Sequence, residues 1–228
     1  MKNKKDLMTI LSYAEENYLK AIYHLSEGGN KGVSTNDISN EMKTKPASVS
    51  DMLRKLAEKA VIDYRKYYGV TITEAGKKMA LQVIRKHRLW EVFLVEKLKF
   101  SWDEVHEVAE ELEHVKSPLL MQRLDEYLNY PKFDPHGDPI PDEYGDLKSR
   151  PRLLLNELDI HDTGQIVAVK DSSAAFLRYL DKVGAYIGAR IKVLEKVEFD
   201  GSLEILVDNR KNLFVSREVA SNILILQR

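Results

Sequence analysis

Two histidines and two carboxylates in the segment from Ser101 to Lys116 have the side chains and spacing of a metal site. If the segment is a helix, with about 100° between successive residues, four potential ligands fall within an arc of roughly 100°: His106, Glu110, Glu113 and His114. Imidazole nitrogens and carboxylate oxygens bind Mn²⁺, Fe²⁺, Co²⁺ or Zn²⁺. The segment therefore predicts a transition-metal site.

A second pair of potential ligands lies upstream of this segment. His87 and Glu91, in RKHRLWE, are four residues apart, which is one turn of a helix. A single pair of this kind usually belongs to a solvated helix face. Three of the six histidines, however, fall between positions 87 and 114. This clustering favours metal binding over chance.

The composition is that of a globular protein with an uneven distribution of charge. The 228 residues are 43% hydrophobic and include no Cys, which excludes disulfides and thiolate-bound zinc. Residues 1–100 carry 19 Lys and Arg against 12 Asp and Glu, whereas residues 101–147 carry 3 against 13. A basic first part suits a polyanion and an acidic middle suits cations. No segment has the apolar length of a membrane span or signal peptide, so we expect a cytoplasmic protein without a membrane partner.

Three helices are predicted ahead of the metal segment. Apolar residues at spacings of three and four predict the first helix from about Leu7 to Glu27. Ser34 begins an acidic form of the capping box and opens a short helix from Thr35 to Met42. Pro46 suits the first position of a third helix, whose apolar residues Val49, Leu53 and Leu56 face inward.

A β-rich stretch follows these helices. Ile62 to Tyr67 and Val70 to Ile72 flank a Tyr-Gly pair and predict a hairpin. Three helices and a hairpin are typical of a winged helix, in which the second helix of the turn motif enters the major groove of double-stranded DNA. Small residues at the start of that helix allow it to approach base edges, and basic residues contact phosphates. We expect the DNA-facing residues to be Lys43, Lys45, Ala47, Ser48, Ser50, Asp51, Arg54, Lys55, Arg65 and Lys66. A winged helix used for protein contacts is the alternative, but the basic residues gather on the DNA-facing elements.

Two further helices flank the metal segment. Thr73 caps a helix from about Glu74 to Lys97, and Ser117-Pro118 opens another that reaches about Asn129. Their large apolar side chains exceed what three short helices can bury among themselves. This excess predicts a dimer interface, with an intramolecular core against the winged helix as the alternative.

The remainder of the chain consists of a proline-rich segment followed by a β-rich segment. Residues 131–151 are rich in proline, lack periodicity and read as a linker or an extended strap. Beyond them, short β-rich runs predict a small barrel, with a helix from Ser172 to Val183 capped by Asp171 or Ser172. The predicted strands are Gln165 to Lys170, Ala189 to Phe199, Leu203 to Val207, Asn212 to Val215 and Ile223 to Leu226. His136 and His161 lie in loops, where we expect surface histidines and not ligands.

Several of these segments together resemble the diphtheria toxin repressor family of metal-dependent transcriptional repressors. The resemblance covers essentially the whole chain and rests on AEENYLKAIYHL, TITEAGKKMA, RKHRLWE, VHEVAEELEHV and DPHGDPIP. It implies a mainly α fold with small β parts. A winged-helix DNA-binding domain would occupy residues 1–73 and a helical metal-binding and dimerisation domain residues 74–130. A barrel resembling the Src-homology-3 fold would occupy residues 152–228, after the linker at 131–151.

The resemblance also assigns the ligands to two sites. The primary site would comprise Asn17, Glu110, Glu113 and His114, and the second His87, Glu91 and His106 with Asp171 from the barrel. Two residues depart from the family. At the position of Glu110, iron-responsive members of the family have Cys. At the position of Asn17, members of the family have Met or Asp. Hard oxygen donors favour the manganese-responsive branch.

The function implied is that of a homodimeric Mn²⁺-activated repressor of metal uptake genes, with two ions per subunit and no enzymatic activity. An Fe²⁺-responsive repressor of the same family is the alternative. A di-metal hydrolase or a metal-storage protein would use the same His/Glu cluster. No nucleophile or spare general base stands out beside the cluster, and a hydrolase would leave the winged helix unexplained.

Overall fold

The computed structural model describes residues 11–65, 68–147 and 151–227, which form two compact units. The first unit contains the described residues up to His87 together with Leu112–Ser117 and Pro141–Leu147. The second contains Arg88–Glu111, Pro118–Ile140 and the described residues that follow.

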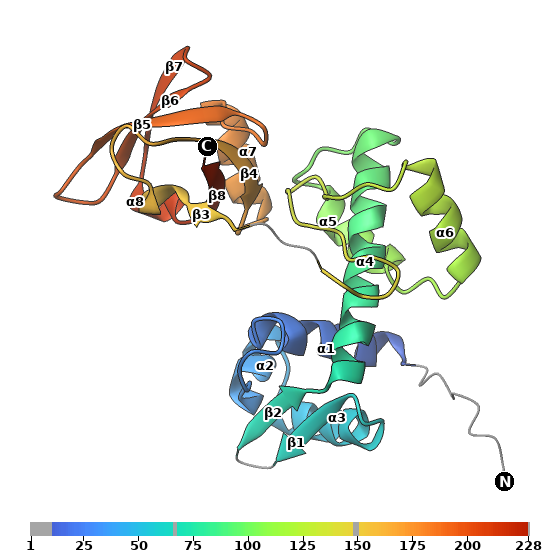
Figure 1. Cartoon of the computed structure of the whole chain (residues 1–228). Helices are drawn as coiled ribbons and strands as arrows, with labels where there is room; N and C mark the ends of the chain where they lie inside the picture. Colours follow the sequence, from blue (N-terminus) through green and yellow to red (C-terminus); the bar gives the residue numbers. More distant parts are fainter. Residues whose placement is uncertain (1–10, 66–67, 148–150, 228) are drawn as a thin grey trace, which may run out of the picture. The chain divides into compact units, whose positions relative to one another are not determined.

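The first unit has the predicted winged-helix order (Figure 1). Ser12 caps its first helix through a capping box with Glu15, and Ser34 caps the second by accepting from the backbone N–H of Asp37. Pro46 is the first residue of the third helix. The elements are α1 (Tyr13–Leu25), α2 (Thr35–Glu41), α3 (Pro46–Glu58), β1 (Ile62–Arg65) and β2 (Gly69–Ile72). The part of the first predicted helix before residue 11 lies outside the described residues.

The core of this unit follows the predicted periodicity. Val49, Leu53 and Leu56 of α3 are fully buried and pack in one cluster with Leu19 and Ile22 of α1. Burying a Leu or Ile side chain contributes about 1.5–3 kcal/mol. The opposite face of α3 remains exposed.

Three helices follow the hairpin; the first two carry predicted ligands, and the second differs from the prediction. They are α4 (Glu74–Glu96), α5 (Val105–Leu112) and α6 (Pro118–Tyr127). The sequence predicts one helix through Lys116, but α5 ends at Leu112, before Glu113 and His114. Pro118 disfavours helical backbone at the residue before it. Glu113, moreover, is held in the core of the first unit by contacts described below.

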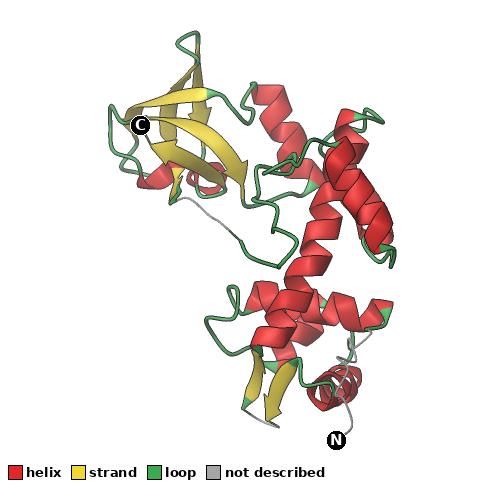
Figure 2. Cartoon of the chain, turned by 45° about the vertical axis from the view of Figure 1, so that its right-hand side comes forward, coloured by secondary structure: helices red, strands yellow, loops and turns green. Residues whose placement is uncertain are grey.

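The C-terminal part is an antiparallel sheet domain, as predicted (Figure 2). Its strand order is β3-β8-β4-β5-β6-β7. The strands are β3 (Leu153–Leu154), β4 (Thr163–Val169), β5 (Arg190–Lys196), β6 (Leu203–Val207), β7 (Lys211–Val215) and β8 (Ile223–Gln227). The helices are η1 (Leu155–Glu157), α7 (Ala174–Val183) and α8 (Arg217–Ala220). Strand β3 and helix α8 were not predicted, and the cap of α7 is Ser173 instead of Asp171 or Ser172.

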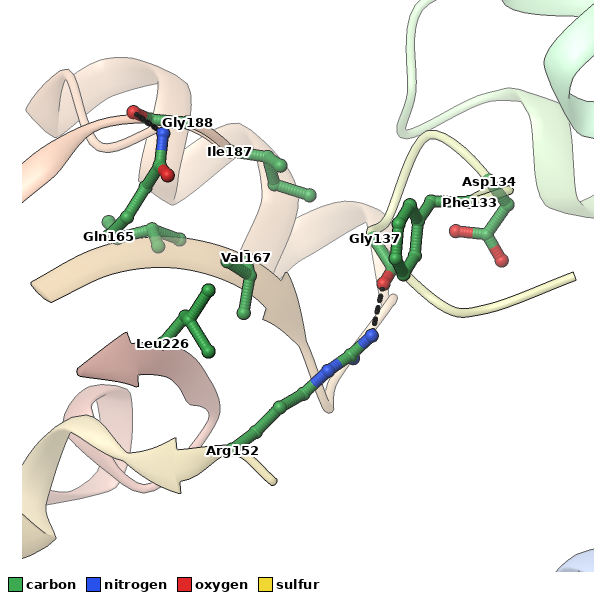
Figure 3. A pocket seen from close by; sticks show the side chains of 10 residues that line it. Phe133, Asp134, Gly137, Arg152, Gln165, Val167, Ile187, Gly188 and Leu226 are labelled. Atoms are coloured by element: carbon green, nitrogen blue, oxygen red, sulfur yellow. Dashed lines mark hydrogen bonds between the residues drawn. The ribbon is translucent and has the colours of Figure 1, made fainter. Parts of the chain in front are cut away.

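A turn within residues 131–140, which we call the strap, lies against β4 in the second unit. The backbone N–H of Val169 donates to the carbonyl of His136 at 3.1 Å. Arg152 donates to the carbonyl of Gly137 at 2.9 Å (Figure 3). Strap and sheet border an open pocket of about 270 Å³ lined by Phe133, Asp134, Gly137, Arg152, Gln165, Ile166, Val167, Ile187, Gly188 and Leu226.

Among the described residues, no helix combines the length and apolar character that crossing a bilayer requires.

Candidate metal centre

Among the described residues of the first unit, two buried side-chain atoms have no hydrogen-bond partner, and both belong to predicted ligands. They are Oδ1 of Asn17, on α1, and Nε2 of His114, just after α5. A buried polar atom left without a partner costs about 1–3 kcal/mol. Such atoms in native proteins call for a ligand, an ion or a water. A cation is the simplest partner for a carbonyl oxygen and an imidazole lone pair.

The orientation of His114 fits metal binding. Its Nδ1 lies 2.5 Å from Oε2 of Glu16, so the Nδ1–H donates to that carboxylate and the lone pair is left on Nε2. Histidines that bind metals are commonly held by such a carboxylate on the other ring nitrogen. Glu16 is therefore placed to orient a ligand.

Glu113 supplies the charge of this cluster. Its side chain is completely buried, and its Oε1 lies 3.5 Å from Nε2 of His114. Burial raises the pKa of Glu113, but the hydrogen bond from His87 and the ammonium of Lys20 outweigh burial and hold it below its ordinary value. An ionised oxygen thus faces an imidazole lone pair at a separation that two ligands of one ion adopt, about 3.0–3.5 Å.

A second buried group lies in the other unit. One potential ligand atom from each of Glu91, Asp134 and His136 can be chosen so that all three lie within 4.8 Å of one another. The three residues are buried. The group joins α4 to the strap.

His136 is oriented in the same way as His114. Its Nε2 lies 2.7 Å from the carbonyl oxygen of Trp102, to which the Nε2–H donates. Burial lowers the pKa of His136, but the hydrogen bond and charge of Glu91 outweigh burial and raise it. In the neutral imidazole the lone pair is on Nδ1, which lies 3.6 Å from Oε1 of Glu91. Both groups therefore pair a fixed imidazole lone pair with a buried glutamate oxygen.

The charge balance of the second group also favours a cation. Burial raises the pKa of Asp134 to about 7, Arg88 opposes this rise, and repulsion from Glu91 and Asp138 adds to it. The Nε of Arg88 lies 3.2 Å from Oδ2 of Asp134. Carboxylates crowded into a buried space are stabilised by an added positive charge.

His106 and Glu110 lie at a more open position of the second unit. The imidazole of His106 is 49% exposed, with Nδ1 3.5 Å from Oε1 of Glu91 and Nε2 3.6 Å from Oε1 of Glu110. The predicted neighbours Glu91 and His106 are thus close together. Glu91 is shared between His106 and His136.

The expectation that His136 is a surface histidine is wrong. The residue is only 4% exposed because the strap turns inward and the imidazole reaches Trp102 and Glu91. The Asp-Pro-His spacing, with an acidic residue two positions before the imidazole, could have suggested a ligand pair. His161 is exposed, as expected. Asp171 is not part of the buried group, and its Oδ1 accepts from the backbone N–H of Ser173.

The predicted DNA-facing residues lie on the exposed side of the winged helix. Ser50 is half-buried and donates to the carbonyl of Pro46, and Lys66 lies outside the described residues. The exposed ones are Lys43, Lys45, Ala47, Ser48, Asp51, Arg54, Lys55 and Arg65. Arg54 contacts Asp51 at 2.7 Å, whereas Lys43 stands in the turn between α2 and α3 with a φ of 47°.

We expect Lys55→Ala to weaken binding to operator and random DNA alike, because phosphate contacts are independent of sequence. The slope of log K against log salt should fall by about 0.9 for each phosphate contact that is lost. Ser48→Trp should instead impair operator binding selectively, because a large side chain blocks the approach of α3 to base edges. Fluorescence anisotropy over a salt series measures both effects, with Lys182→Ala on α7 as the control. Unchanged operator affinity in Ser48→Trp would show that α3 is not the reading helix.

Comparison with protein families gives three matches in chain order. Residues 10–70 match the N-terminal DNA-binding domain of iron-dependent repressors. Residues 73–142 match the metal-binding and dimerisation domain of the same repressors. Residues 153–226 match the FeoA domain.

Two relatives illustrate the similarity in sequence. An HTH-type transcriptional regulator MntR of Oceanobacillus iheyensis is 32% identical over 120 residues, which are 52% of this chain and 80% of the relative. The iron-dependent repressor IdeR of Mycobacterium tuberculosis is 34% identical over 126 residues, which are 55% of this chain and 54% of IdeR.

Two solved structures are similar over nearly the whole chain. A manganese-dependent transcriptional repressor in complex with manganese has a TM-score of 0.85 and 35% identity, covering 94% of this chain and 100% of the other. ScaR with bound Cd²⁺ has a TM-score of 0.78 and 32% identity, covering 94% and 99%. With the fold, the domain matches and these similarities in agreement, the chain belongs to the diphtheria toxin repressor family of metal-dependent transcriptional repressors, which are DNA-binding proteins and not enzymes.

Proposed function

We propose that the chain is a Mn²⁺-activated repressor that binds double-stranded operator DNA as a homodimer and controls metal uptake genes. The observation that carries the proposal is the pair of unpartnered buried atoms, Oδ1 of Asn17 and Nε2 of His114, beside the ionised Glu113. Manganese is named in solved relatives that are 32–35% identical to this chain. As a DNA-binding protein, the chain would act in the cytoplasm.

The ligands we propose belong to two sites per subunit. The primary site uses Asn17, Glu113 and His114, to which the family resemblance adds Glu110. The second site uses Glu91 with His106, and we add Asp134 and His136 on the basis of the buried group they form with Glu91. The resemblance assigns His87 and Asp171 to this second site as well. We also propose that the domains meet near residues 73, 130 and 151.

The chain couples metal to DNA through α1. A bound ion supplies a positive charge that ligands from different elements share. Asn17 belongs to the first helix of the winged helix, whereas Glu113 and His114 belong to the segment after α5. By coordinating one ion together, these residues would fix α1 and so favour the arrangement in which two recognition helices of a dimer meet successive half-sites. Metal and operator must then strengthen each other's binding reciprocally.

The apolar surface of α6 supports the dimer. Leu119 is 63% exposed, Leu120 43% and Tyr127 61% within one subunit. Neighbouring exposed apolar side chains on one short helix are typical of a protein interface. The helix lies within the segment that matches the metal-binding and dimerisation domain.

The carboxylate at position 110 predicts which metal ions activate DNA binding. The proposed primary ligands are three oxygens and one imidazole, and this set suits Mn²⁺ and Fe²⁺. Zn²⁺ is satisfied by four ligands, whereas fixing α1 requires the coordination number that includes Asn17. We therefore expect tight Zn²⁺ binding with poor activation of DNA binding, and weaker Mn²⁺ binding with full activation. Glu110→Cys should move activation towards Fe²⁺ and Co²⁺, measured at buffered free concentrations. An unchanged order of activating ions would contradict this role of position 110.

Operator binding titrated with metal tests the proposed function. A repressor requires metal to bind its operator, whereas a storage protein binds metal without any effect on DNA. Performing the titration at matched free Mn²⁺ and Fe²⁺ separates the manganese-responsive from the iron-responsive alternative. Operator affinity that does not depend on metal would reject the proposal.

A further inference from the structure

The ammonium of Lys20 is paired with the carboxylate of Glu113, which we assign to the primary metal site. Its Nζ lies 2.7 Å from Oε1 and 2.8 Å from Oε2 of Glu113, so one ammonium contacts both oxygens. The side chain of Glu113 is fully buried, whereas that of Lys20 is 14% exposed. The carboxylate that we assign to a divalent ion is therefore paired with a cation of the protein itself.

The remaining contacts of Glu113 leave little room for a second cation. Nδ1 of His87 lies 2.7 Å from Oε2, so this oxygen already has two donors. An ammonium that contacts both oxygens takes the lone pairs that point between them, which are also those that a chelated ion uses. Two cations on one buried carboxylate repel each other strongly, because the surroundings screen charge poorly.

We propose that Lys20 is a built-in competitor of the metal, and that its ammonium must leave Glu113 before the primary site can fill. The inference rests on the proposed function, because it assumes that Glu113 is a ligand. Lys20 then sets the free ion concentration at which the repressor responds. The long, flexible lysine stem and its partial exposure give the ammonium a route to water.

The position of Lys20 on α1 makes the exchange direct. Asn17 and Lys20 are three residues apart in the helix and so lie on the same face. Lys20 contacts Glu113, and Asn17 carries the unpartnered Oδ1. In the exchange that we propose, Glu113 passes from Lys20 to the ion, and Asn17 becomes a ligand of the same ion. The connection of α1 to the segment after α5 then changes from a lysine contact to a metal contact.

The test is the Mn²⁺ affinity of the full chain without DNA, measured by competition with a metallochromic chelator at fixed pH and ionic strength. We expect Lys20→Met to bind Mn²⁺ at least about 10-fold more tightly than the parent, because a neutral stem removes the competing charge. Lys20→Arg should remain close to the parent. Lys59→Met is the matched control, because Lys59 pairs with the buried Glu15 of the same helix at 2.8 Å and does not touch Glu113. Its Mn²⁺ affinity should equal that of the parent.

Unchanged or weaker Mn²⁺ binding in Lys20→Met would overturn the inference and assign Lys20 to the positioning of Glu113. Circular dichroism checks the fold of each variant, and Lys20→Gln replaces Lys20→Met if the latter does not fold. Glu113→Gln distinguishes failure of the proposed metal site from failure of the proposed role of Lys20. If Glu113→Gln retains parental Mn²⁺ affinity, the proposed primary site itself is misplaced. If Glu113→Gln loses Mn²⁺ affinity while Lys20→Met does not gain it, only the role of Lys20 fails.

Discussion

His114→Ala is expected to lose Mn²⁺-dependent operator binding. The substitution removes the nitrogen whose lone pair is buried without a partner and leaves Glu16 without its imidazole. Partners that merely hold a metal ligand contribute about 10- to 100-fold to metal affinity, so loss of the ligand itself should cost at least about 100-fold. Glu113→Gln should have a similar effect, because it removes the ionised oxygen that faces His114. Calorimetry gives the metal affinity, and anisotropy gives the DNA response.

Glu111→Gln provides the matched control for these substitutions. It makes the same chemical change two residues from Glu113, at an exposed position. Parental behaviour of Glu111→Gln with a lost response in Glu113→Gln would locate the effect at the buried cluster. A parental Mn²⁺ response in a folded His114→Ala variant would contradict the assignment of the primary site.

Gly137→Ala is expected to weaken metal binding at the second site by about 10- to 100-fold, the range found for groups that support metal ligands. A Cβ at Gly137, where φ is 85°, would meet the carbonyl oxygen of Val167 at 1.9 Å and Cα of Ala168 at 2.7 Å. Both are backbone atoms of β4 and cannot swing away as a side chain could. The strap would have to move off the strand, displacing the neighbouring proposed ligands Asp134 and His136. Calorimetric titration with Mn²⁺ should then show the loss of one of two binding events.

Gly184→Ala separates this effect from simple backbone strain. Gly184 has a similar φ of 78°, but only the flexible end of Lys211 lies within 4 Å of its Cβ position. A residue with a side chain at positive φ costs about 1–3 kcal/mol in both variants. We expect Gly184→Ala to lower the melting temperature and to leave metal binding intact. Equal metal affinities in the two variants would mean that the second site does not depend on the strap.

The local elements could be predicted because their determinants lie within a few residues of one another. Ser34 caps α2, Pro46 starts α3, and the spacing of Val49 and Leu53 identifies the buried face. The five longer strands of the C-terminal sheet were predicted to within about four residues at each end. The two-residue β3 is too short to show alternation, and it exists through pairing with the distant β8. Contacts of this kind leave no periodic pattern in the sequence.

The arrangement of the ligands depended on contacts that the sequence does not reveal. A helical arc groups Glu113 and His114 with His106 and Glu110, but α5 ends before Glu113 and His114, and the orientation of these two comes from Lys20, His87 and Glu16. His136 was assigned to the surface because residues in proline-rich loops are usually exposed. Its burial follows from the contacts of the imidazole with Trp102 and Glu91 and from the hydrogen bond of its carbonyl with Val169 of β4, all of which join residues more than 30 positions apart.

In the turn before α3, Lys43 combines a backbone conformation that lowers stability with an exposed positive charge. Lys43 has a φ of 47°, a left-handed conformation that glycine adopts without penalty and that costs lysine about 1 kcal/mol. Glycine there would relax the backbone but would remove an exposed ammonium from the proposed DNA-facing side. The turn is thus a position where a more heat-resistant winged helix would also be a weaker ligand for a polyanion.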